Sequence, residues 1–544
     1  GAWLGVADAE YRVDDASAEA GIDADTLREV AEVVASAGTR LAAHNWRSAG
    51  SGNLGGWQVA RTLTLISALL GALATEGGTF PNSWNKFSPR PPRLPHQHPR
   101  RWNDVLWPDP YPLALMEMSF LMPHLMRDQD AFVDVYFTRV YNPVWTNPDG
   151  FSWIEMLTDD RRIGQHVAMT PTWNETAYFA DYVLPMGHSS ERHDLTTYEQ
   201  YDGQWIGFRQ PVLRTARERL GEPVGDTREV NPGEVWEENE FWIELTWRID
   251  PDGSLGIREF FESVERPGEK MTVDEYYGWI FENSVPGLPA AAAAEGLSPL
   301  EYMRRYGAFE VARKIGKVYE QPVPDAELED VRVDGQGRVW SRAPVPPSPK
   351  APGGTKIDPD PDGRRRVGVR VDGEIVRGWP TPSGKLEFFS PTLHAWGWAE
   401  LAVPTYVKSH VHPERLEADQ MPLITTFRVP VQIHTRSANA KWLDEIAHTN
   451  PLWIHPTDAA RLGIARTGDL VRVETDLGHF VLKAWITEGI RPGVLACSHH
   501  MGRWNPERHE GQRIGMMTVA LDQEGSQGGL SRARGGGTFE WSDR

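Results

Sequence analysis

The stretch from residue 131 to residue 185 constrains the fold more than any other part of the chain. "AFVDVYFTRV" (131–140) is an apolar run typical of a buried strand, and "QHVAMT" (165–170) is a second one. Between them lie the turn "YNPVWTNPDG" (141–150) and the helical pattern "FSWIEMLTDD" (151–160). A strand, a helix and a second strand in this order predict a parallel sheet.

The N-terminal part of the chain repeats this order. "GIDADTLREVAEVVASAG" (21–38) predicts a helix, "RLAAHNW" (40–46) a short strand, and a glycine-rich turn (47–58) leads into a helix through residue 74. We therefore expect residues 1–215 to form a doubly wound α/β core of two interleaved lobes, with a lobe boundary near residues 80–130.

The later segments change character twice. Residues 216–395 combine helical patterns with a Pro/Gly-rich linker (343–366), and we interpret them as a helical insertion with its linker. "GWPTPSGKLEFFSPTL" (378–393) predicts a turn followed by a strand. From residue 420 the pattern is one of short strands and turns, so we expect residues 396–544 to form a compact β-barrel domain.

Composition excludes several classes of function. A formal charge of −20 argues against nucleic acid and against a polybasic membrane patch. The single cysteine, Cys497, cannot hold an iron–sulfur cluster or a structural zinc ion. The most apolar stretch (63–74) is shorter than the roughly 20 residues that a membrane span needs, and it is interpreted as a buried helix. Because the chain starts at Gly1 in mid-pattern, we expect a preceding portion that this sequence does not show.

The segment "TPTWNETAYFADYVLP" (170–185) places polar side chains where a parallel strand ends. Open α/β folds bind their ligands at this edge, where helix N-termini favour phosphate. The site hypothesis competes with a simpler one, in which Thr172, Asn174 and Thr176 are helix caps.

A second polar loop follows the first strand of the expected barrel. Its side chains suit an anionic, heteroaromatic ligand, although an exposed polar loop is an equal alternative, and they are Thr426, Arg428, His434, Thr435, Arg436, Ser437 and Asn439. The adjacent His499 and His500 point to opposite faces of a strand and cannot chelate one ion together. In "MGHSSERHD" (186–194) the histidine spacing does not match a metalloprotease helix, and a surface loop is the alternative there.

Taken together, these places resemble one family. "NETAYFADYVLP" resembles the "ETA…ADVVLP" signature of the molybdopterin-dinucleotide oxidoreductases of the dimethyl sulfoxide reductase superfamily, and "YNP" resembles their strand-end "NP". "TPSGKLEFFS" is similar to their "TPSGK-E-S" turn, and "NPLWIHPTDAARLGI…GDLVRVET" to their C-terminal dinucleotide-binding domain. Residues 41–78, with Asn53, Gln58 and Arg61, look like the helix that follows the family's "NG-Q--R". The resemblance implies that the barrel is six-stranded and of the double-psi type.

The resemblance also implies which residues contact the cofactor, a bis-molybdopterin guanine dinucleotide carrying molybdenum or tungsten. The cofactor-binding positions that it assigns are Asn53, Asn142, Thr170, Thr172, Glu175, Thr176, Asp181, Arg209, Gln210, Thr426, Arg428, His434, Thr435, Arg436, Ser437, Asn439, His499, His500 and Gly502. Our hypothesis for the catalytic residues that face the substrate is His188, Glu191, Arg192 or His193. No metal ligand is identified, and a [4Fe–4S] cluster is expected only on a preceding portion or on a partner.

The implied function is that of a catalytic subunit performing two-electron chemistry on a small molecule. "SANAKWLDEIAHTNPLWIHP" looks closest to the polysulfide, thiosulfate and arsenate reductases, whose partners are a ferredoxin-like iron–sulfur subunit and a membrane anchor. Formate dehydrogenase, a non-redox scaffold subunit of a respiratory complex, and a hydratase or transhydroxylase are the alternatives. The compartment is open between cytoplasm and periplasm, with membrane association through partners.

Overall fold

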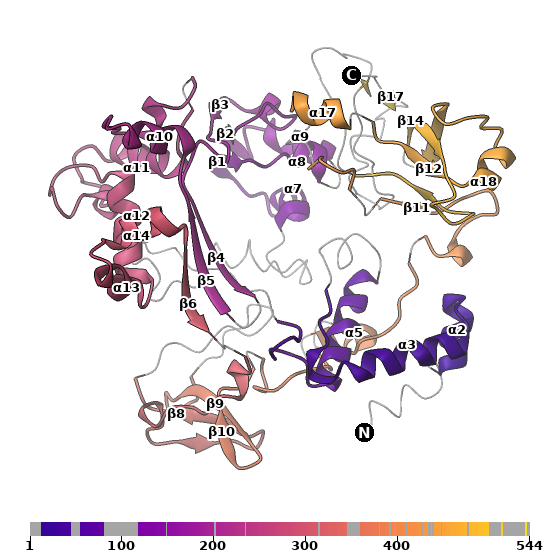
Figure 1. The fold of residues 1–544 in the computed structure, drawn as a ribbon, viewed down its shortest axis with the longest axis horizontal. Helices are drawn as coiled ribbons and strands as arrows, with labels where there is room; N and C mark the ends of the chain where they lie inside the picture. Colours follow the sequence, from indigo (N-terminus) through magenta and orange to yellow (C-terminus); the bar gives the residue numbers. More distant parts are fainter. Residues whose placement is uncertain are drawn as a thin grey trace.

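The structure is a computed structural model of the chain. It describes residues 12–44, 55–80, 118–147, 150–200, 203–233, 235–313, 316–344, 359–379, 381–390, 393–394, 397, 399–409, 411–425, 428–433, 437, 440–447, 449–475, 478–499, 513–514 and 539–540. Figure 1 shows four groups of elements: N-terminal helices, a parallel sheet, a helical unit with an antiparallel sheet, and a C-terminal sheet, with a further small sheet below the helical unit.

The N-terminal helices are α2 (Val13–Ala20), α3 (Ala24–Ser36) and α5 (Gly56–Leu69). α3 begins where predicted because the Asp23 carboxylate accepts hydrogen bonds from the backbone N–H groups of Asp25 and Thr26. The strand expected at residues 40–46 is not found at its described positions, 40–44, where a 3₁₀ turn leads into extended chain.

The parallel sheet consists of β1 (Val133–Arg139), β2 (Ile163–Thr170) and β3 (Tyr182–Pro185). All neighbours are parallel, as predicted, and the connection from β1 to β2 runs through α8 (Pro143–Thr146) and α9 (Gly150–Leu157). α7 (Met118–Asp128) packs against α9. The strand order is β1-β2-β3, in chain order, so within the described residues the sheet winds in one direction; double winding is not confirmed.

The helical unit follows the parallel sheet. Its long antiparallel sheet has the order β4-β5-β6 and consists of β4 (Asp194–Gln200), β5 (Gly203–Arg209) and β6 (Ala308–Arg313). Its helices are α10 (Val212–Arg219), α11 (Glu238–Ile249), α12 (Val273–Ser284), α13 (Leu288–Ala294) and α14 (Pro299–Tyr306). The sheet and the helices share one core, in which Ile206, Phe281 and Leu288 are fully buried.

Residues 216–395 contain more strand than the helical patterns predict. Besides β6, they hold a four-stranded antiparallel sheet of order β10-β9-β8-β7, made of β7 (Arg332–Val333), β8 (Arg338–Ser341), β9 (Arg365–Val371) and β10 (Glu374–Val376). The turn predicted around Gly384 is present, with a positive φ of 76°. The strand expected directly after it is not found at residues 385–390.

The C-terminal sheet has the order β11-β15-β12-β14-β13. Its strands are β11 (Leu423–Ile424), β12 (Leu452–Ile454), β13 (Leu470–Thr475), β14 (Gly478–Ile486) and β15 (Leu495–Ala496). Its helices are α17 (Lys441–Ile446) and α18 (Pro456–Arg461), and a small pair is formed by β16 (Arg513–Ile514) and β17 (Phe539–Glu540). Five strands are joined in the described part of the domain, so the six-stranded barrel is not confirmed.

Short 3₁₀ turns link these elements. They are η1 (Gly38–Arg40), η3 (Ala177–Phe179), η4 (Thr227–Glu229), η5 (Arg258–Phe261), η6 (Val318–Glu320), η7 (Asp325–Glu327), η8 (Ala399–Leu401) and η9 (Pro413–Arg415). None of the helices in the described ranges is both long and apolar enough to cross a bilayer.

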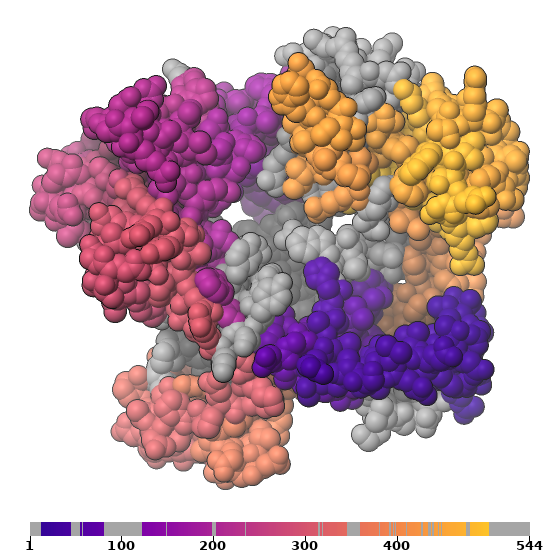
Figure 2. All heavy atoms as spheres, in the orientation of Figure 1, coloured from indigo at the N-terminus to yellow at the C-terminus, as the bar shows by residue number. Residues whose placement is uncertain are grey.

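The parallel sheet and the C-terminal sheet are joined by one hydrophobic core. Trp153, Met156 and Leu157 of α9 belong to the same buried cluster as Leu452 of β12, Leu482 of β14 and Cys497. Burial in this cluster raises the pKa of the Cys497 thiol. The two sheets therefore share one core, and Figure 2 shows them side by side. In the same view the helical unit lies on the left and the N-terminal helices lie below the C-terminal sheet.

Candidate functional site

The carboxyl edge of the parallel sheet gathers the chain segments that the sequence singles out. Because β1, β2 and β3 are parallel, the residues that follow each strand lie along the same edge of the sheet. These segments are 140–146 after β1, 171–176 after β2 and 186–193 after β3. The polar run that begins at Thr170 thus lies where the sequence places it.

Three buried side chains tie the first two segments together. Asn142 donates from Nδ2 to Glu175 Oε2 at 2.6 Å, and its Oδ1 accepts from Thr176 N at 3.0 Å and from Thr176 Oγ1 at 2.9 Å. Thr176 Oγ1 also accepts from Val144 N at 3.1 Å. Asn142 is 6% exposed, Glu175 1% and Thr176 0%. These residues fix the shape of the edge by bonding to one another, and their contact with a ligand stays a prediction.

The neighbouring polar residues stabilise the segment after β2 from within. Asn174 Nδ2 donates to Thr170 Oγ1 at 3.2 Å, and Asn174 Oδ1 accepts from Ala177 N at 2.9 Å. Thr170 Oγ1 donates to the Thr172 carbonyl at 2.6 Å. Asn174 therefore caps the turn that follows it, as the simpler sequence hypothesis states, whereas the Thr176 side chain caps no helix in the described part of the chain.

Asp181 has a structural contact at the opposite end of the segment. Its Oδ2 accepts from the backbone N–H of His166 at 2.7 Å, and the buried His166 bonds through Nε2 to Thr138 Oγ1 at 2.9 Å. Burial lowers the pKa of His166, although the Phe179 carbonyl and Asp181 raise it. Asp181 thus joins the start of β3 to β2, away from the carboxyl edge where its predicted contact with the cofactor would lie.

Replacing Asn142 by Ala is expected to destabilise the protein by about 2 to 4 kcal/mol, because it leaves the Thr176 N–H and the Glu175 carboxylate buried without this partner. Urea unfolding followed by circular dichroism measures the change. Asn283, which is exposed and donates to the Trp279 carbonyl, is the matched control. An Asn142→Ala variant as stable as Asn283→Ala would contradict the role assigned to Asn142.

The four predicted catalytic residues lie in the loop after β3 but in different surroundings. His188 is exposed, and its backbone N–H donates to Glu191 Oε2 at 2.8 Å. Arg192 donates to Glu238 Oε2 at 2.7 Å. His193 is only 3% exposed, and its ring stacks on Phe208 at 5.6 Å, inside the core of the helical unit. The structure exposes His188, leaves Glu191 and Arg192 partly buried, and encloses His193.

This loop is held on both sides. Gly187 N donates to the Trp236 carbonyl at 2.8 Å, and Asn231 Nδ2 donates to the Glu191 carbonyl at 2.8 Å. Arg209 at the end of β5 donates to Asp194 Oδ2 at 2.5 Å, and Gln210 Nε2 donates to the Arg304 carbonyl at 2.9 Å. Arg209 therefore adjoins the loop, while Gln210 contacts α14.

The C-terminal sheet has an edge of the same kind. β11 and β15 are parallel, so the loops after Ile424 and after Ala496 leave the sheet side by side. His499 Nδ1 lies 2.5 Å from the Thr425 carbonyl, and the buried Asn450 exchanges two hydrogen bonds with the backbone of Ser498, at 2.7 and 2.8 Å. Val429 N donates to Ser498 Oγ at 3.3 Å. The two loops that carry the predicted binding residues are thus fastened together.

Two basic groups meet at this edge. Burial lowers the pKa of His499, and the Arg428 guanidinium lowers it further, although the bond to the Thr425 carbonyl raises it. Arg428 is exposed. Ser437, by contrast, is buried and serves the loop itself, because it accepts from Ile433 N at 2.7 Å and donates to Gln432 Oε1 at 2.7 Å. Eight predicted binding residues lie outside the described residues: Asn53, Thr426, His434, Thr435, Arg436, Asn439, His500 and Gly502.

Each of the two edges carries a strained valine. Val140, directly after β1, has a φ of 50°, and Val431, in the loop after β11, has a φ of 64°. A β-branched residue in the left-handed region costs about 1 to 2 kcal/mol. Strain of this kind concentrates at functional sites, where the surrounding contacts hold it in place. It therefore supports both edges as parts of a site.

Several residues that shape these edges are not evident from the sequence. Arg139 and Glu238 join β1 to the N-terminus of α11 at 2.9 Å, and Asn450 and Gln432 bind the loops of the C-terminal edge. Arg61, which the resemblance aligns with a family motif, donates to three backbone carbonyls in the segment 388–402. Its burial lowers its pKa. Among these residues, only Arg139 has a position in the sequence, at the end of a predicted strand, that indicates a part in shaping the edge.

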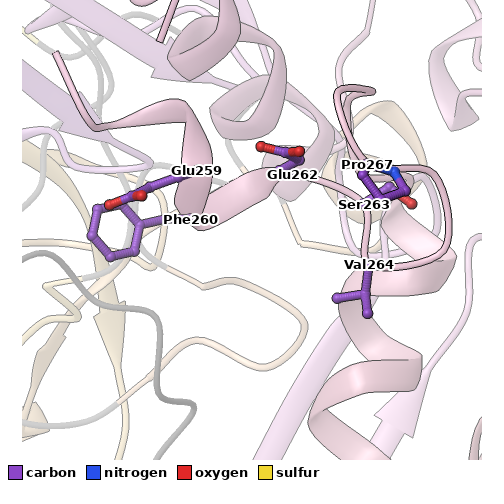
Figure 3. A pocket seen from close by; sticks show the side chains of 6 residues that line it. All are labelled: Glu259, Phe260, Glu262, Ser263, Val264 and Pro267. Atoms are coloured by element: carbon purple, nitrogen blue, oxygen red, sulfur yellow. The ribbon is translucent and has the colours of Figure 1, made fainter. Parts of the chain in front are cut away.

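One pocket lies elsewhere. Figure 3 shows it beside η5, lined by Glu259, Phe260, Glu262, Ser263, Val264 and Pro267, with a volume of about 410 Å³. None of the predicted site residues lines it. It is therefore not part of the candidate site.

The chain is similar to several known proteins. The family described as the Molydopterin dinucleotide binding domain matches residues 423–530. The chain is 22% identical over 531 residues to trimethylamine-N-oxide reductase of Haemophilus influenzae, covering 90% of this chain and 52% of the relative. It is 32% identical over 123 residues to the thiosulfate reductase molybdopterin-containing subunit of Salmonella typhimurium, covering 23% of this chain and 15% of that subunit.

Among solved structures, acetylene hydratase from Pelobacter acetylenicus superposes with a TM-score of 0.58 at 17% identity, covering 96% of this chain and 61% of that one. This likeness shows a shared fold. The chain spans about half the length of the trimethylamine-N-oxide reductase that it matches.

The domain that residues 423–530 match supports a molybdopterin dinucleotide as the cofactor. These similarities support a relationship to the molybdopterin oxidoreductases of the dimethyl sulfoxide reductase superfamily.

Proposed function

We propose that this chain acts in a catalytic subunit that reduces a small oxygen- or sulfur-containing acceptor by two electrons at a bis-molybdopterin guanine dinucleotide. The named relatives that support this reaction are reductases of trimethylamine-N-oxide, dimethyl sulfoxide and thiosulfate. Within that range we favour the polysulfide, thiosulfate and arsenate reductase type. Electrons would arrive through iron–sulfur centres, with a ferredoxin-like partner subunit and a membrane anchor.

The observation that carries the proposal is the common core of the two sheets. Val144 and Trp145, two and three residues after Asn142, share one buried cluster with Cys497, which directly precedes Ser498 and His499. The segments that the family resemblance assigns to opposite halves of the cofactor are therefore packed against one hydrophobic core. An elongated dinucleotide needs two such edges on one rigid body.

The residues present suit the proposed cofactor. Arg428 and the half-buried His499 place two basic groups beside each other, and in the described part of the chain Arg428 pairs with no carboxylate. A pyrophosphate at this position would receive charge-assisted hydrogen bonds and would relieve the repulsion that lowers the pKa of His499. At the other edge, Asn142, Glu175 and Thr176 would hold the loop that faces the second nucleotide.

When bound, the cofactor would supply the metal that exchanges electrons with the substrate. The roles left to the chain are binding and orientation. Arg428 and His499 would bind phosphate, the loop after β3 would present His188, Glu191 and Arg192 to the substrate, and the common core would hold the two edges at a fixed separation.

Metal and nucleotide analysis tests the proposal. The protein is purified through an affinity tag from its own cells, grown with molybdate or tungstate, together with the subunits that remain bound. We expect close to one molybdenum or tungsten ion and two guanine nucleotides per chain, released on acid hydrolysis. We also expect dithionite-reduced benzyl viologen to be oxidised by thiosulfate, polysulfide, arsenate, trimethylamine-N-oxide or dimethyl sulfoxide.

The alternatives give different results. A scaffold subunit would contain neither metal nor guanine nucleotide. A hydratase or transhydroxylase would turn over without any external electron acceptor, and a formate dehydrogenase would reduce viologen with formate. Absence of both metal and nucleotide from cofactor-replete cells would overturn the proposal.

A further inference from the structure

The carboxyl edge of the parallel sheet carries a cluster of charged side chains that come from four secondary-structure elements and one loop. We call it the arginine cluster, and it consists of Arg139 at the end of β1, Arg192 in the loop after β3, Arg209 at the end of β5, Glu238 at the start of α11 and Asp194 at the start of β4. Three guanidinium groups face two carboxylates, so the cluster has a net charge of one positive.

The contacts form a chain across the edge. Glu238 Oε2 accepts from Arg139 Nε at 2.9 Å and from Arg192 Nη1 at 2.7 Å. Asp194 Oδ2 in turn lies 3.5 Å from Arg192 Nη2 and accepts from Arg209 Nη2 at 2.5 Å. One carboxylate oxygen therefore holds two guanidinium groups that would otherwise repel each other.

The two outer arginines keep donors available. The Arg139 side chain is 43% exposed and that of Arg209 is 47% exposed, whereas that of Arg192 is 17% exposed. Arg139 bonds through Nε and Nη2, and Arg209 through Nη2 alone, in the described part of the chain. Arg139 Nη1 and two N–H-bearing atoms of Arg209 thus remain for a ligand, since each guanidinium carries five N–H donors.

The charge of the whole chain makes this cluster distinctive. A net charge of −20 repels anions from most of the surface, while the cluster presents positive charge at the edge where ligands of α/β sheets bind. Arginine is the residue best suited to phosphate and to other oxyanions, because its planar fork matches two oxygens at once.

We propose that Arg139, held in place by Glu238, binds an oxyanion group of the ligand at this edge, with Arg209 as the second donor. The inference rests on the proposed function in one respect, namely that the ligand is either the cofactor, through a phosphate, or an anionic substrate such as thiosulfate or arsenate. Both ligands present the same chemistry, a group with several negatively charged oxygens.

The test compares wild type with Arg139→Gln, Arg139→Lys and the control Arg248→Gln. Arg248 also pairs with a glutamate, Glu244 at 2.6 Å, but it lies in the last turn of α11. Calorimetry on the cofactor-free full chain measures the affinity for inorganic pyrophosphate. We expect Arg139→Gln to weaken binding roughly tenfold to a hundredfold, Arg139→Lys to weaken it less, and Arg248→Gln to leave it unchanged.

Two further measurements identify the source of the oxyanion. If it is a cofactor phosphate, the guanine nucleotide content of Arg139→Gln falls below that of the control. If it is the substrate, the nucleotide content holds and KM rises for thiosulfate or arsenate but not for the uncharged dimethyl sulfoxide. Thermal unfolding without ligand shows whether each variant is folded.

The inference is overturned if Arg139→Gln matches Arg248→Gln in pyrophosphate affinity. A wild-type protein that contains neither metal nor nucleotide would contradict the proposed function instead. The comparison of pyrophosphate affinities would still decide whether Arg139 binds an oxyanion.

Discussion

Replacing Glu237 by Gln is expected to stabilise the protein above pH 7 and to leave its stability near pH 5 unchanged. Glu237 is 0% exposed, and burial raises its pKa to about 8 from an ordinary 4.5. The neighbouring Glu240 carboxylate raises it further, while the backbone N–H groups of Glu240 and Asn239 oppose the shift. Glutamine accepts the same two N–H groups but cannot ionise.

The sign follows from proton linkage. Because the folded-state pKa of Glu237 lies above the unfolded one, the folded protein binds more protons between pH 4.5 and 8. This contribution to stability is fully present below pH 4.5 and is lost as the pH rises through 8. Each pH unit inside the window corresponds to about 1.4 kcal/mol, so the expected loss between pH 6.5 and pH 8 is about 2 kcal/mol.

His193 acts in the opposite direction. Its ring lies between Phe208 and Tyr277, with Nδ1 3.9 Å from Glu237 Oε1. Burial lowers the pKa of His193 to about 3 from 6.5, and the cations Arg214 and Arg304 lower it further. Its contribution is therefore complete above pH 6.5 and is lost as the pH falls toward 3. Between pH 4.5 and 6.5 the two effects offset each other, which predicts a plateau of stability there.

Urea unfolding of wild type and Glu237→Gln at pH 5, 7 and 8.5 measures the effect. The control is Glu222→Gln, an exposed residue that pairs with Arg217 at 2.6 Å and should change stability by less than about 0.5 kcal/mol at every pH. An equal difference between wild type and Glu237→Gln at pH 5 and pH 8.5 would show that Glu237 is ionised in the folded protein at both.

Local signals made several elements predictable. The pattern "ENEFWIELTWRI" matches α11 residue for residue, and α12 begins after Thr272, whose capping box with Glu275 is visible in the sequence. β1 and β2 follow from continuous apolar runs. In each case the residues that determine the element lie within it or next to it.

Elements that depend on distant partners escaped prediction. β7 has two residues and pairs with β8, while β9 starts inside a segment whose Pro and Gly content predicts a linker. Its valines become strand because β8 and β10 flank them on both sides, which no local pattern encodes.

In the candidate site, too, the features that local sequence determines were predictable and the contacts between distant residues were not. Parallel strands predict that the segments after β1 and β2 lie together, and they do. The sequence does not show that Asn142, Glu175 and Thr176 bond to one another, nor that Glu238 reaches Arg139 from α11. His193 was expected to face the substrate because of its position in the chain, yet its side chain enters the core beside Phe208.

Replacing Trp153 by Ala is expected to cost about 3 to 5 kcal/mol and to loosen the C-terminal sheet as well as its own helix. Trp153 is 1% exposed in α9, and its ring lies edge-on to Tyr141 at 5.8 Å. It belongs to the cluster that also contains Leu452, Phe480 and Leu482 of the C-terminal sheet. Truncation removes a large, fully buried side chain and leaves a cavity in the core that joins the two sheets.

Hydrogen exchange at the amides of β12 and β14 distinguishes a shared core from two separate ones. If the core is shared, Trp153→Ala accelerates exchange in both strands, although they lie about three hundred residues away in sequence. Trp442 is the matched control because its side chain is 72% exposed on α17, and its replacement by Ala should leave these amides protected. Trp153→Phe should cost less than Trp153→Ala, since it keeps a ring and removes an indole N–H that is buried without a partner among the described residues. Unchanged exchange in β12 and β14 of Trp153→Ala would mean that the two sheets fold independently. The proposal that both edges bind one dinucleotide would then lose the shared core on which it rests.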